Sequence, residues 1–159
     1  MESGEIVPVQ RAVIETPNGV VPWRPAIGTP LNQCPSNIDA STMRGRALLL
    51  AAGNPGDIEF DKQGRAEITA TGWLIYPDEG IDPETGEVGT FCRTVLFAKD
   101  GRTFRTSAAH GPARLKAALE IFDPVDWKEG ITFVITRRLG KRDRWYHDIR
   151  LHERYLEEE

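Results

Sequence analysis

The chain has 159 residues, of which 40% are hydrophobic and 28% are charged, so it can bury the core of one domain. Its formal net charge of −4 argues against nucleic-acid binding over the whole surface. No segment reaches the roughly 20 consecutive apolar residues that cross a membrane, and the start lacks the basic and apolar regions of a secretory signal. The sequence therefore predicts a cytoplasmic protein that does not contact a membrane.

Residues 1–43 hold six of the eleven prolines of the chain. Because proline interrupts helices and central strands, we expect this Pro-rich arm to be disordered or to wrap over the folded body in extended form. Val20, Val21, Trp23 and Ile27 are apolar enough to dock on that body. This favours partial ordering of the second half of the arm.

Residues 44–52 form a short apolar run that predicts a strand. Residues 65–76 alternate with the period of two that is typical of a strand. One face of this strand is expected to hold Ala66, Ile68, Ala70 and Leu74, and the other Glu67, Thr69, Thr71, Trp73 and Ile75. The alternation thus places Trp73 away from the apolar face, and an acidic loop is predicted over residues 77–89.

Residues 90–107 predict a β-hairpin that turns at Asp100-Gly101, since Asp-Gly is typical of tight hairpin turns. Gly111-Pro112 then begins a helix, because proline is well suited to the first helical position, and a following Asp-Pro pair ends it. The apolar stripe of this helix, which we expect to face the core, consists of Leu115, Ala118, Leu119 and Phe122.

Residues 130–138 and 144–151 are two further predicted strands, joined by a tight turn at Leu139–Asp143. Five strands with a helix between strands 3 and 4 predict an all-β OB-fold, which is a five-stranded Greek-key barrel. A β-sandwich with one helix is the alternative. This interpretation divides the chain into the Pro-rich arm (1–43), an OB-fold domain (44–152) and an acidic C-terminal tail (153–159).

Aromatic and basic side chains in these strands point to binding of unpaired nucleic acid. Aromatic rings stack on bases with little sequence preference, and Arg and Lys neutralise phosphates. The candidate stacking residues are Trp73, Tyr76, Phe91, Phe104, Trp145 and Tyr146. The candidate phosphate-binding residues are Arg93, Arg105, Arg137, Arg138, Lys141, Arg142 and Arg144. Core packing is the alternative for the rings, as we expect for Phe97 and Phe133, and a solvated hairpin tip is the alternative for the charges.

The sequence indicates neither a cofactor nor a metal site. Cys34 and Cys92 form no CxxC pair and are expected to be free thiols, with a disulfide between them as the alternative. The three histidines do not match a zinc-binding spacing. The alternating carboxylates of residues 57–61 lie among glycines and a proline, which favours a solvated loop. Since no catalytic motif is present, we expect a protein that is not an enzyme.

Two stretches carry a family resemblance, namely RTVLFAKDGRTFRTSAAHGPARLKAALEIF and GITFVITRRLGKRDRWYHDIRL. The positions that match are Thr94, Leu96, Phe97, Ala98, Asp100, Gly101, Phe104, Ser107, Lys141 and Tyr146. They resemble the single-stranded-DNA-binding proteins of tailed bacteriophages, notably phages that replicate linear genomes by protein priming. The resemblance implies an OB-type fold and sequence-tolerant coating of DNA in phage or mobile-element replication or recombination, in the cytoplasm of a bacterial host. The long Pro-rich arm and the higher arginine content depart from that family.

Single-stranded DNA is therefore the expected partner. RNA is an alternative, because no visible feature reads a 2′-hydroxyl group. The acidic tail is a candidate contact for replication proteins, and a homo-oligomer or cooperative assembly on DNA is compatible with the sequence. Two rival functions are a protein-interaction or virion-assembly β-barrel, whose basic hairpin meets an acidic partner, and a small nuclease or accessory enzyme.

Overall fold

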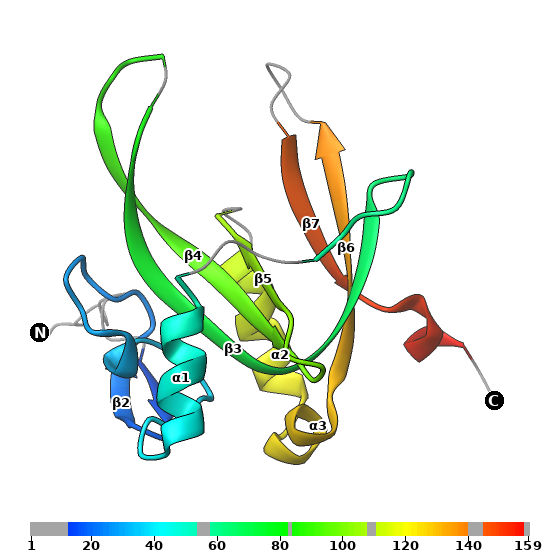
Figure 1. The fold of residues 1–159 in the computed structure, drawn as a ribbon, viewed down its shortest axis with the longest axis horizontal. Coiled ribbons are helices and arrows are strands. Elements are labelled where there is room, and N and C mark those ends of the chain that lie inside the picture. The colour runs from blue at the N-terminus through cyan, green and yellow to red at the C-terminus, as the bar shows by residue number, and fades with distance from the viewer. Residues whose placement is uncertain (1–12, 54–57, 83, 108–110, 140–144, 158–159) are drawn as a thin grey trace, which may run out of the picture.

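The computed structural model describes residues 13–53, 58–82, 84–107, 111–139 and 145–157 (Figure 1). Their elements in chain order are β1 (Val13–Thr16), β2 (Gly19–Pro22), η2 (Leu31–Gln33), α1 (Met43–Ala51), β3 (Arg65–Ile81), β4 (Val88–Ala98), β5 (Thr103–Thr106), α2 (Gly111–Ile121), α3 (Pro124–Glu129), β6 (Ile131–Leu139), β7 (Trp145–Leu151) and η4 (Glu153–Leu156). Strands β1 and β2 form a small sheet, and the others form a five-stranded sheet in the order β5-β4-β3-β6-β7. All pairings are antiparallel, so the protein is mostly β with three short α-helices.

The second half of the chain follows the prediction closely. The hairpin at Asp100-Gly101 is confirmed as β4 and β5, and Gly101 has a φ of 97°, which favours glycine. The helix that begins at Gly111 is confirmed as α2, and the last two predicted strands are confirmed as β6 and β7. Of the predicted turn at Leu139–Asp143, only Leu139 lies within the described residues. The helices α2 and α3 separate the third and fourth strands of the main sheet.

The prediction of a strand over residues 44–52 is wrong, because this segment forms helix α1. Its residues are mainly Arg, Ala and Leu, which are strong helix formers, and none is β-branched. Thr42 caps the helix by accepting a hydrogen bond from the N–H of Gly45 at 2.9 Å. The number of strands in the main sheet is still five, because residues 90–107 supply two strands rather than one.

The predicted acidic loop over residues 77–89 is also wrong. Strand β3 continues to Ile81 and β4 begins at Val88, so the segment is a projecting extension of the β3–β4 hairpin (Figure 1). Pro77 lies within β3, where its missing N–H is tolerated because only one side of β3 is paired at this point. We call residues 77–82 and 84–88 the acidic tip.

A β-bulge in β3 reverses the alternation of its side chains, so that odd-numbered residues after the bulge share the face of even-numbered residues before it. The register against β4 shifts between Ala70 and Gly72, which leaves Thr71 as the extra residue. Ala70 before the bulge and Trp73 after it belong to the same core, whereas Leu74 packs in a cluster on the opposite face. The predicted faces of Trp73, Leu74 and Ile75 are therefore wrong, because strict alternation does not continue through a bulge.

Two apolar clusters hold the main sheet, one on each face, with α1 and α2 on opposite sides of β3 and β4 (Figure 1). The first lies between the sheet and α2 and α3, and it includes Ile68, Trp73, Leu96, Phe104, Leu115, Trp127 and Phe133. The second lies beneath α1, and it includes Cys34, Ile38, Leu49, Leu74, Val95 and Phe97. The predictions that Phe97 and Phe133 are core residues, and that the stripe of α2 faces the core, are confirmed.

Part of the Pro-rich arm runs along the edge of β3 that does not pair with β4. Asn37 acts there like a short strand, because its Nδ2 donates to Thr71 O at 3.1 Å and its Oδ1 accepts from Trp73 N at 2.9 Å. The hydroxyl of Ser36 donates to the carbonyl of Trp73 at 2.7 Å. These contacts satisfy backbone groups of β3 beyond the point where its pairing with β6 ends. Further back in the arm, Trp23 is buried in the first cluster.

The described part of the predicted acidic tail lies against the sheet. Glu153 forms an ion pair with Arg65 of β3. The hydroxyl of Tyr155 in η4 accepts a hydrogen bond from the N–H of Thr132 at 3.0 Å. These contacts tie residues 153–156 to β3 and β6, whereas the last two glutamates lie outside the described residues.

Strands β5 and β7 are the two edges of the main sheet, and no described ladder joins them. Side chains connect these edges instead. Thr106 of β5 and His147 of β7 share a hydrogen bond of 2.9 Å. The ring of Phe104 meets the ring of His147 edge-on, with the centroids 5.1 Å apart. The sheet is therefore curved enough to bring its first and last strands within side-chain reach.

Candidate nucleic-acid interface

The structure divides the predicted site residues into a core group and two surface groups. Trp73 and Phe104 belong to the core, and they are 1% and 3% exposed. Trp73 packs against Trp23 with ring centroids 6.1 Å apart, while Phe104 packs against His147. A ring needs an open face to stack on a base. The prediction of Trp73 and Phe104 as stacking residues is therefore corrected to a role in the core.

The first surface group lies on the face of the β3–β4–β5 sheet that carries the second cluster and α1, at the base of the acidic tip. Tyr76 is directly opposite Arg93, and Arg105 follows on the neighbouring strand. Arg105 donates to the carbonyl of Gly53 at 3.1 Å and to the hydroxyl of Tyr76 at 3.4 Å. The guanidinium of Arg93 lies over the ring of Phe91, 5.1 Å from its centroid. The fold thus brings together four of the predicted residues.

The charge of this first group is largely compensated within the protein. Arg93 donates from Nε to a carboxylate oxygen of Asp78 at 2.5 Å, and this hydrogen bond lowers the pKa of Asp78. The same hairpin carries four further acidic residues, Glu79, Asp82, Glu84 and Glu87. A polyanion that approaches this face therefore meets a local excess of negative charge.

The second surface group is a cluster of three arginines around one buried carboxylate, which we call the arginine cluster. Asp148 of β7 lies 2.9 Å from Nε of Arg150 and 3.3 Å from Nε of Arg138, both measured to Oδ2. Nη2 of Arg114 on α2 lies 3.7 Å from Oδ1 of the same carboxylate. The side chains of Arg150, Arg114 and Arg138 remain 62%, 49% and 44% exposed. Within the described residues, the cluster therefore presents three guanidinium groups to solvent around one carboxylate.

The carboxylate of Asp148 stays ionised in this setting. Burial raises its pKa, but the charge of Arg150 and the hydrogen bonds from Arg138 and Arg150 outweigh burial and hold the pKa below its usual value. A buried carboxylate that bonds several guanidinium groups restricts their motion, so the cost of ordering them is met before a ligand binds. Asp148 is therefore a positioning residue for the three arginines.

Strand geometry places an aromatic ring on the same face as the arginine cluster. Tyr146 is opposite Arg138 in the β6–β7 register, and it precedes Asp148 and Arg150 at alternating positions of β7. Its side chain is 42% exposed. Arginines beside a solvent-exposed aromatic residue are the combination that binds the phosphates and bases of a single strand.

Arg138 and Tyr146 are predicted site residues, whereas Arg114, Asp148 and Arg150 were not predicted from the sequence. A signal for two of them existed, because alternation in the last strand puts Tyr146, Asp148 and Arg150 on one face. Arg114 had no such signal, since it lies on a helix whose polar face is otherwise ordinary for a solvated surface. Only the packing of α2 against β7 brings it to the carboxylate.

The remaining predicted basic residues have different environments. The guanidinium of Arg137 lies over the ring of Phe60, 5.3 Å from its centroid, and Phe60 stacks on His147. Arg137 therefore borders the core on the opposite face of β6 from Arg138. The predicted sites at Lys141, Arg142 and Arg144 and the side chain of Trp145 lie outside the described residues.

The two cysteines are free thiols. Burial, and to a smaller degree the charge of Cys92, raises the pKa of Cys34 to about 11. Burial also raises the pKa of Cys92. Both groups are therefore protonated and poorly nucleophilic near neutral pH.

Comparison with protein-family models, with curated proteins and with solved structures found no match to this chain. Functional assignment therefore depends on the geometry of the chain itself. Among the described residues, no helix has the length and apolar character needed to cross a membrane. The same residues hold no group of three or more His, Cys, Asp or Glu side chains able to bind a metal ion.

Proposed function

We propose that the protein binds single-stranded DNA without sequence preference and without catalysis. The observation that carries this proposal is the arginine cluster, in which Asp148 holds Arg114, Arg138 and Arg150 beside the exposed ring of Tyr146. The guanidinium groups would bind successive phosphates, and the ring would stack on a base. Binding at this one surface is compatible with the net charge of −4, since the acidic surfaces elsewhere repel the polyanion.

A single strand fits this surface better than a duplex does. Unpaired bases can reach Tyr146, whereas the bases of a duplex are stacked on one another and paired. Because no described residue is identified as a reader of the 2′-hydroxyl, RNA is the ligand to compare with DNA.

The strand order supports an OB-type fold for this function. Numbered along the chain, the five strands of the main sheet follow the order 3-2-1-4-5. Joining strand 3 to strand 5 would close a five-stranded Greek-key barrel, and the bond between Thr106 and His147 links those two strands. In OB-folds, nucleic acids bind on the face of strands 2 and 3 and near the loops that join strands 1 and 2 and strands 4 and 5. Here the connection between strands 1 and 2 is the acidic tip, which repels phosphates, so the basic surface near strands 4 and 5 is the candidate. The arginine cluster lies on strands 4 and 5 beside α2.

The resemblance to single-stranded-DNA-binding proteins of tailed bacteriophages points in the same direction. It suggests that the protein coats DNA during replication or recombination in a phage or mobile element. Protection of exposed single strands requires contacts that ignore sequence, and both phosphate binding and base stacking have that property.

Fluorescence anisotropy of a labelled thymidine homopolymer, measured at several salt concentrations, tests the proposal. We expect affinity to fall with salt, and a duplex of equal length to bind much more weakly. Replacing one phosphate-binding arginine with glutamine should reduce the slope of log K against log salt by about 0.7. The two test variants are Arg114→Gln and Arg150→Gln.

Arg102→Gln is the matched control. Arg102 is 45% exposed and its Nε lies 2.9 Å from Asp100, so it resembles the test residues in exposure and pairing. It lies in the turn between β4 and β5 rather than in the arginine cluster. The absence of binding to any single strand, or an equal loss in the control variant, would contradict the proposal.

A further inference from the structure

The acidic tip is a preformed hairpin that extends beyond the core. Its backbone ladder continues from Pro77 opposite Cys92 to Ile81 opposite Val88. The end is closed by a hydrogen bond from Asp82 N to Glu87 O at 2.9 Å and by another from Gly86 N to Asp82 O at 2.8 Å. None of its described residues is buried. The tip therefore does not serve the core, although its backbone is well ordered by local hydrogen bonds.

The charge of the acidic tip is of one sign. Residues 77–88 contain five acidic residues and neither lysine nor arginine. Asp78 is paired with Arg93 at the base, whereas Asp82, Glu84 and Glu87 belong to the far end. Such a surface repels phosphates and attracts a cationic surface.

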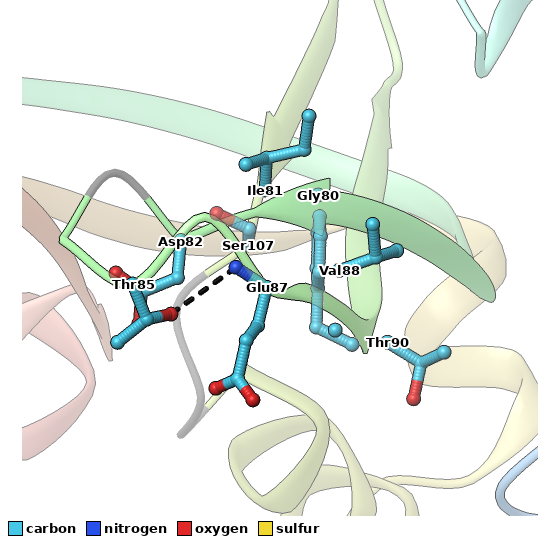
Figure 2. A pocket seen from close by; sticks show the side chains of 10 residues that line it. Gly80, Ile81, Asp82, Thr85, Glu87, Val88, Thr90 and Ser107 are labelled. Carbon is cyan, nitrogen blue, oxygen red and sulfur yellow. Dashed lines mark hydrogen bonds between the residues drawn. The ribbon is translucent and has the colours of Figure 1, made fainter.

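Apolar side chains lie among these carboxylates. Ile81 and Val88 are directly opposite each other and are 70% and 65% exposed. They border an open groove of about 620 Å³, and Figure 2 shows the hydrogen bond of 3.2 Å from the N–H of Glu87 to Thr85 beside it. An exposed apolar centre with a charged rim is typical of a protein-interaction surface.

The complement to this surface is the arginine cluster of the same chain. It offers three exposed guanidinium groups and the ring of Tyr146, which match carboxylates and apolar side chains respectively. Figure 1 shows the acidic tip and the β6–β7 hairpin as two separate arms that project from the same end of the body. The backbone ladder of the tip holds it in its own arm, so the cluster on which it could dock is that of a second molecule.

We infer that the acidic tip of one copy docks on the arginine cluster of a second copy, and that single-stranded DNA displaces it. Carboxylates and phosphates are both oxyanions that guanidinium groups bind through paired hydrogen bonds, so the tip and the DNA compete for the same three arginines. The displacement by DNA rests on the proposed function, whereas the association of two copies does not. Without DNA the protein would therefore form an oligomer in which the arginine cluster is covered, and single-stranded DNA would dissociate it.

Sedimentation velocity without DNA, over a range of protein and salt concentrations, tests the association. We expect oligomers at low salt that dissociate at high salt, because exposed ion pairs are screened. The tip variant, which removes three charges and should be monomeric, combines Asp82→Asn, Glu84→Gln and Glu87→Gln. A control variant with the same charge change on other exposed surfaces, which should still associate, combines Glu120→Gln, Glu129→Gln and Glu157→Gln. A wild-type monomer under all conditions would overturn the inference.

Charge exchange identifies the two surfaces that meet. A tip variant with Glu84→Lys and Glu87→Lys should be monomeric alone, and so should a cluster variant with Arg114→Glu and Arg150→Glu. Mixed together, the two variants should associate in equal amounts, because the unchanged acidic tip of the cluster variant can dock on the unchanged arginine cluster of the tip variant. Association of the cluster variant with itself would show that the tip binds another surface and would overturn the inference.

A thymidine oligonucleotide added to the wild-type oligomer tests displacement. We expect the oligomer to dissociate into DNA-bound monomers. When the protein is concentrated, the variant with Asp82→Asn, Glu84→Gln and Glu87→Gln should bind the same oligonucleotide more tightly than the wild type. An oligomer that grows on the DNA would contradict displacement. Failure of the proposed function has a different signature, since the anisotropy of labelled DNA would then not change while the oligomer persisted.

Discussion

Thr106 and His147 share a hydrogen bond of 2.9 Å that connects the two edge strands of the main sheet. The ring of His147 is also held between Phe60, stacked at 5.7 Å, and Phe104, edge-on at 5.1 Å. One histidine thus joins both ends of the curved sheet. Its protonation state is therefore expected to influence the stability of the whole fold.

Stability should decrease as the pH falls through the titration range of His147. Burial and, secondarily, the charge of Arg137 lower the pKa of His147 from its ordinary value of 6.5. The unfolded chain therefore takes up this proton at a higher pH than the folded protein does. The contribution of neutral His147 to the free energy of unfolding should be fully present above pH 6.5. It should be lost as the pH falls from there through the pKa of the folded protein.

Urea unfolding at a series of pH values measures this effect. His147→Asn keeps a polar atom for Thr106 but removes the titrating group. We expect the variant to show a flatter dependence of unfolding free energy on pH than the wild type between about pH 8 and pH 5.5. Equal dependence in both proteins would show that other groups cause the change.

Replacement of Asp148 distinguishes positioning of the arginines from simple charge. Asp148→Asn makes the net charge one unit more positive, which by charge alone would strengthen DNA binding. It also weakens the charge-assisted hydrogen bonds to Arg138 and Arg150, which would leave the cluster disordered. We expect weaker binding, by roughly tenfold, in line with the loss of about one such bond.

Anisotropy titrations compare this variant with Asp100→Asn, in which a surface carboxylate paired with Arg102 is lost instead. The control should bind DNA as well as the wild type or better. A thermal melt should confirm that both variants are folded. Stronger binding by Asp148→Asn would show that Asp148 acts only as a compensating charge.

Trp73 should affect stability and not DNA binding directly. Because its ring is 1% exposed, Trp73→Ala is expected to lower the free energy of unfolding by about 3–5 kcal/mol. In a variant that keeps Trp73 as its single tryptophan, emission should be blue-shifted and unchanged by a single strand of DNA. That variant combines Trp23→Phe, Trp127→Phe and Trp145→Phe. Quenching by DNA would mean that Trp73 reaches the surface after all.

Asn37 should stabilise the sheet through its two hydrogen bonds to the edge of β3. Asn37→Ala is expected to lower the free energy of unfolding by about 1–3 kcal/mol, because it leaves Thr71 O and Trp73 N unpaired. DNA affinity should not change. Asn32→Ala, at an exposed position in η2, is the matched control and should be neutral in a urea denaturation experiment. No loss from Asn37→Ala would mean that water replaces both bonds at no cost.

Local patterns predicted the second half of the chain well. The Asp100-Gly101 turn and the stripe of α2 each depend on neighbours in sequence, so composition and spacing were sufficient to find them. The prediction of a strand over residues 44–52, which form helix α1, is wrong because a short apolar run is compatible with either structure. The strong helix propensity of its residues was the better guide.

The order and chemistry of the residues were enough to predict a strand-rich protein with arginines and aromatic rings in its last two strands. Which of these side chains face solvent together depends on the three-dimensional packing. The bulge at Thr71 turned Trp73 inward, and the packing of α2 on β7 brought Arg114 to Asp148. Both outcomes depend on contacts between residues distant in sequence, and periodicity within one segment contains no information about such contacts.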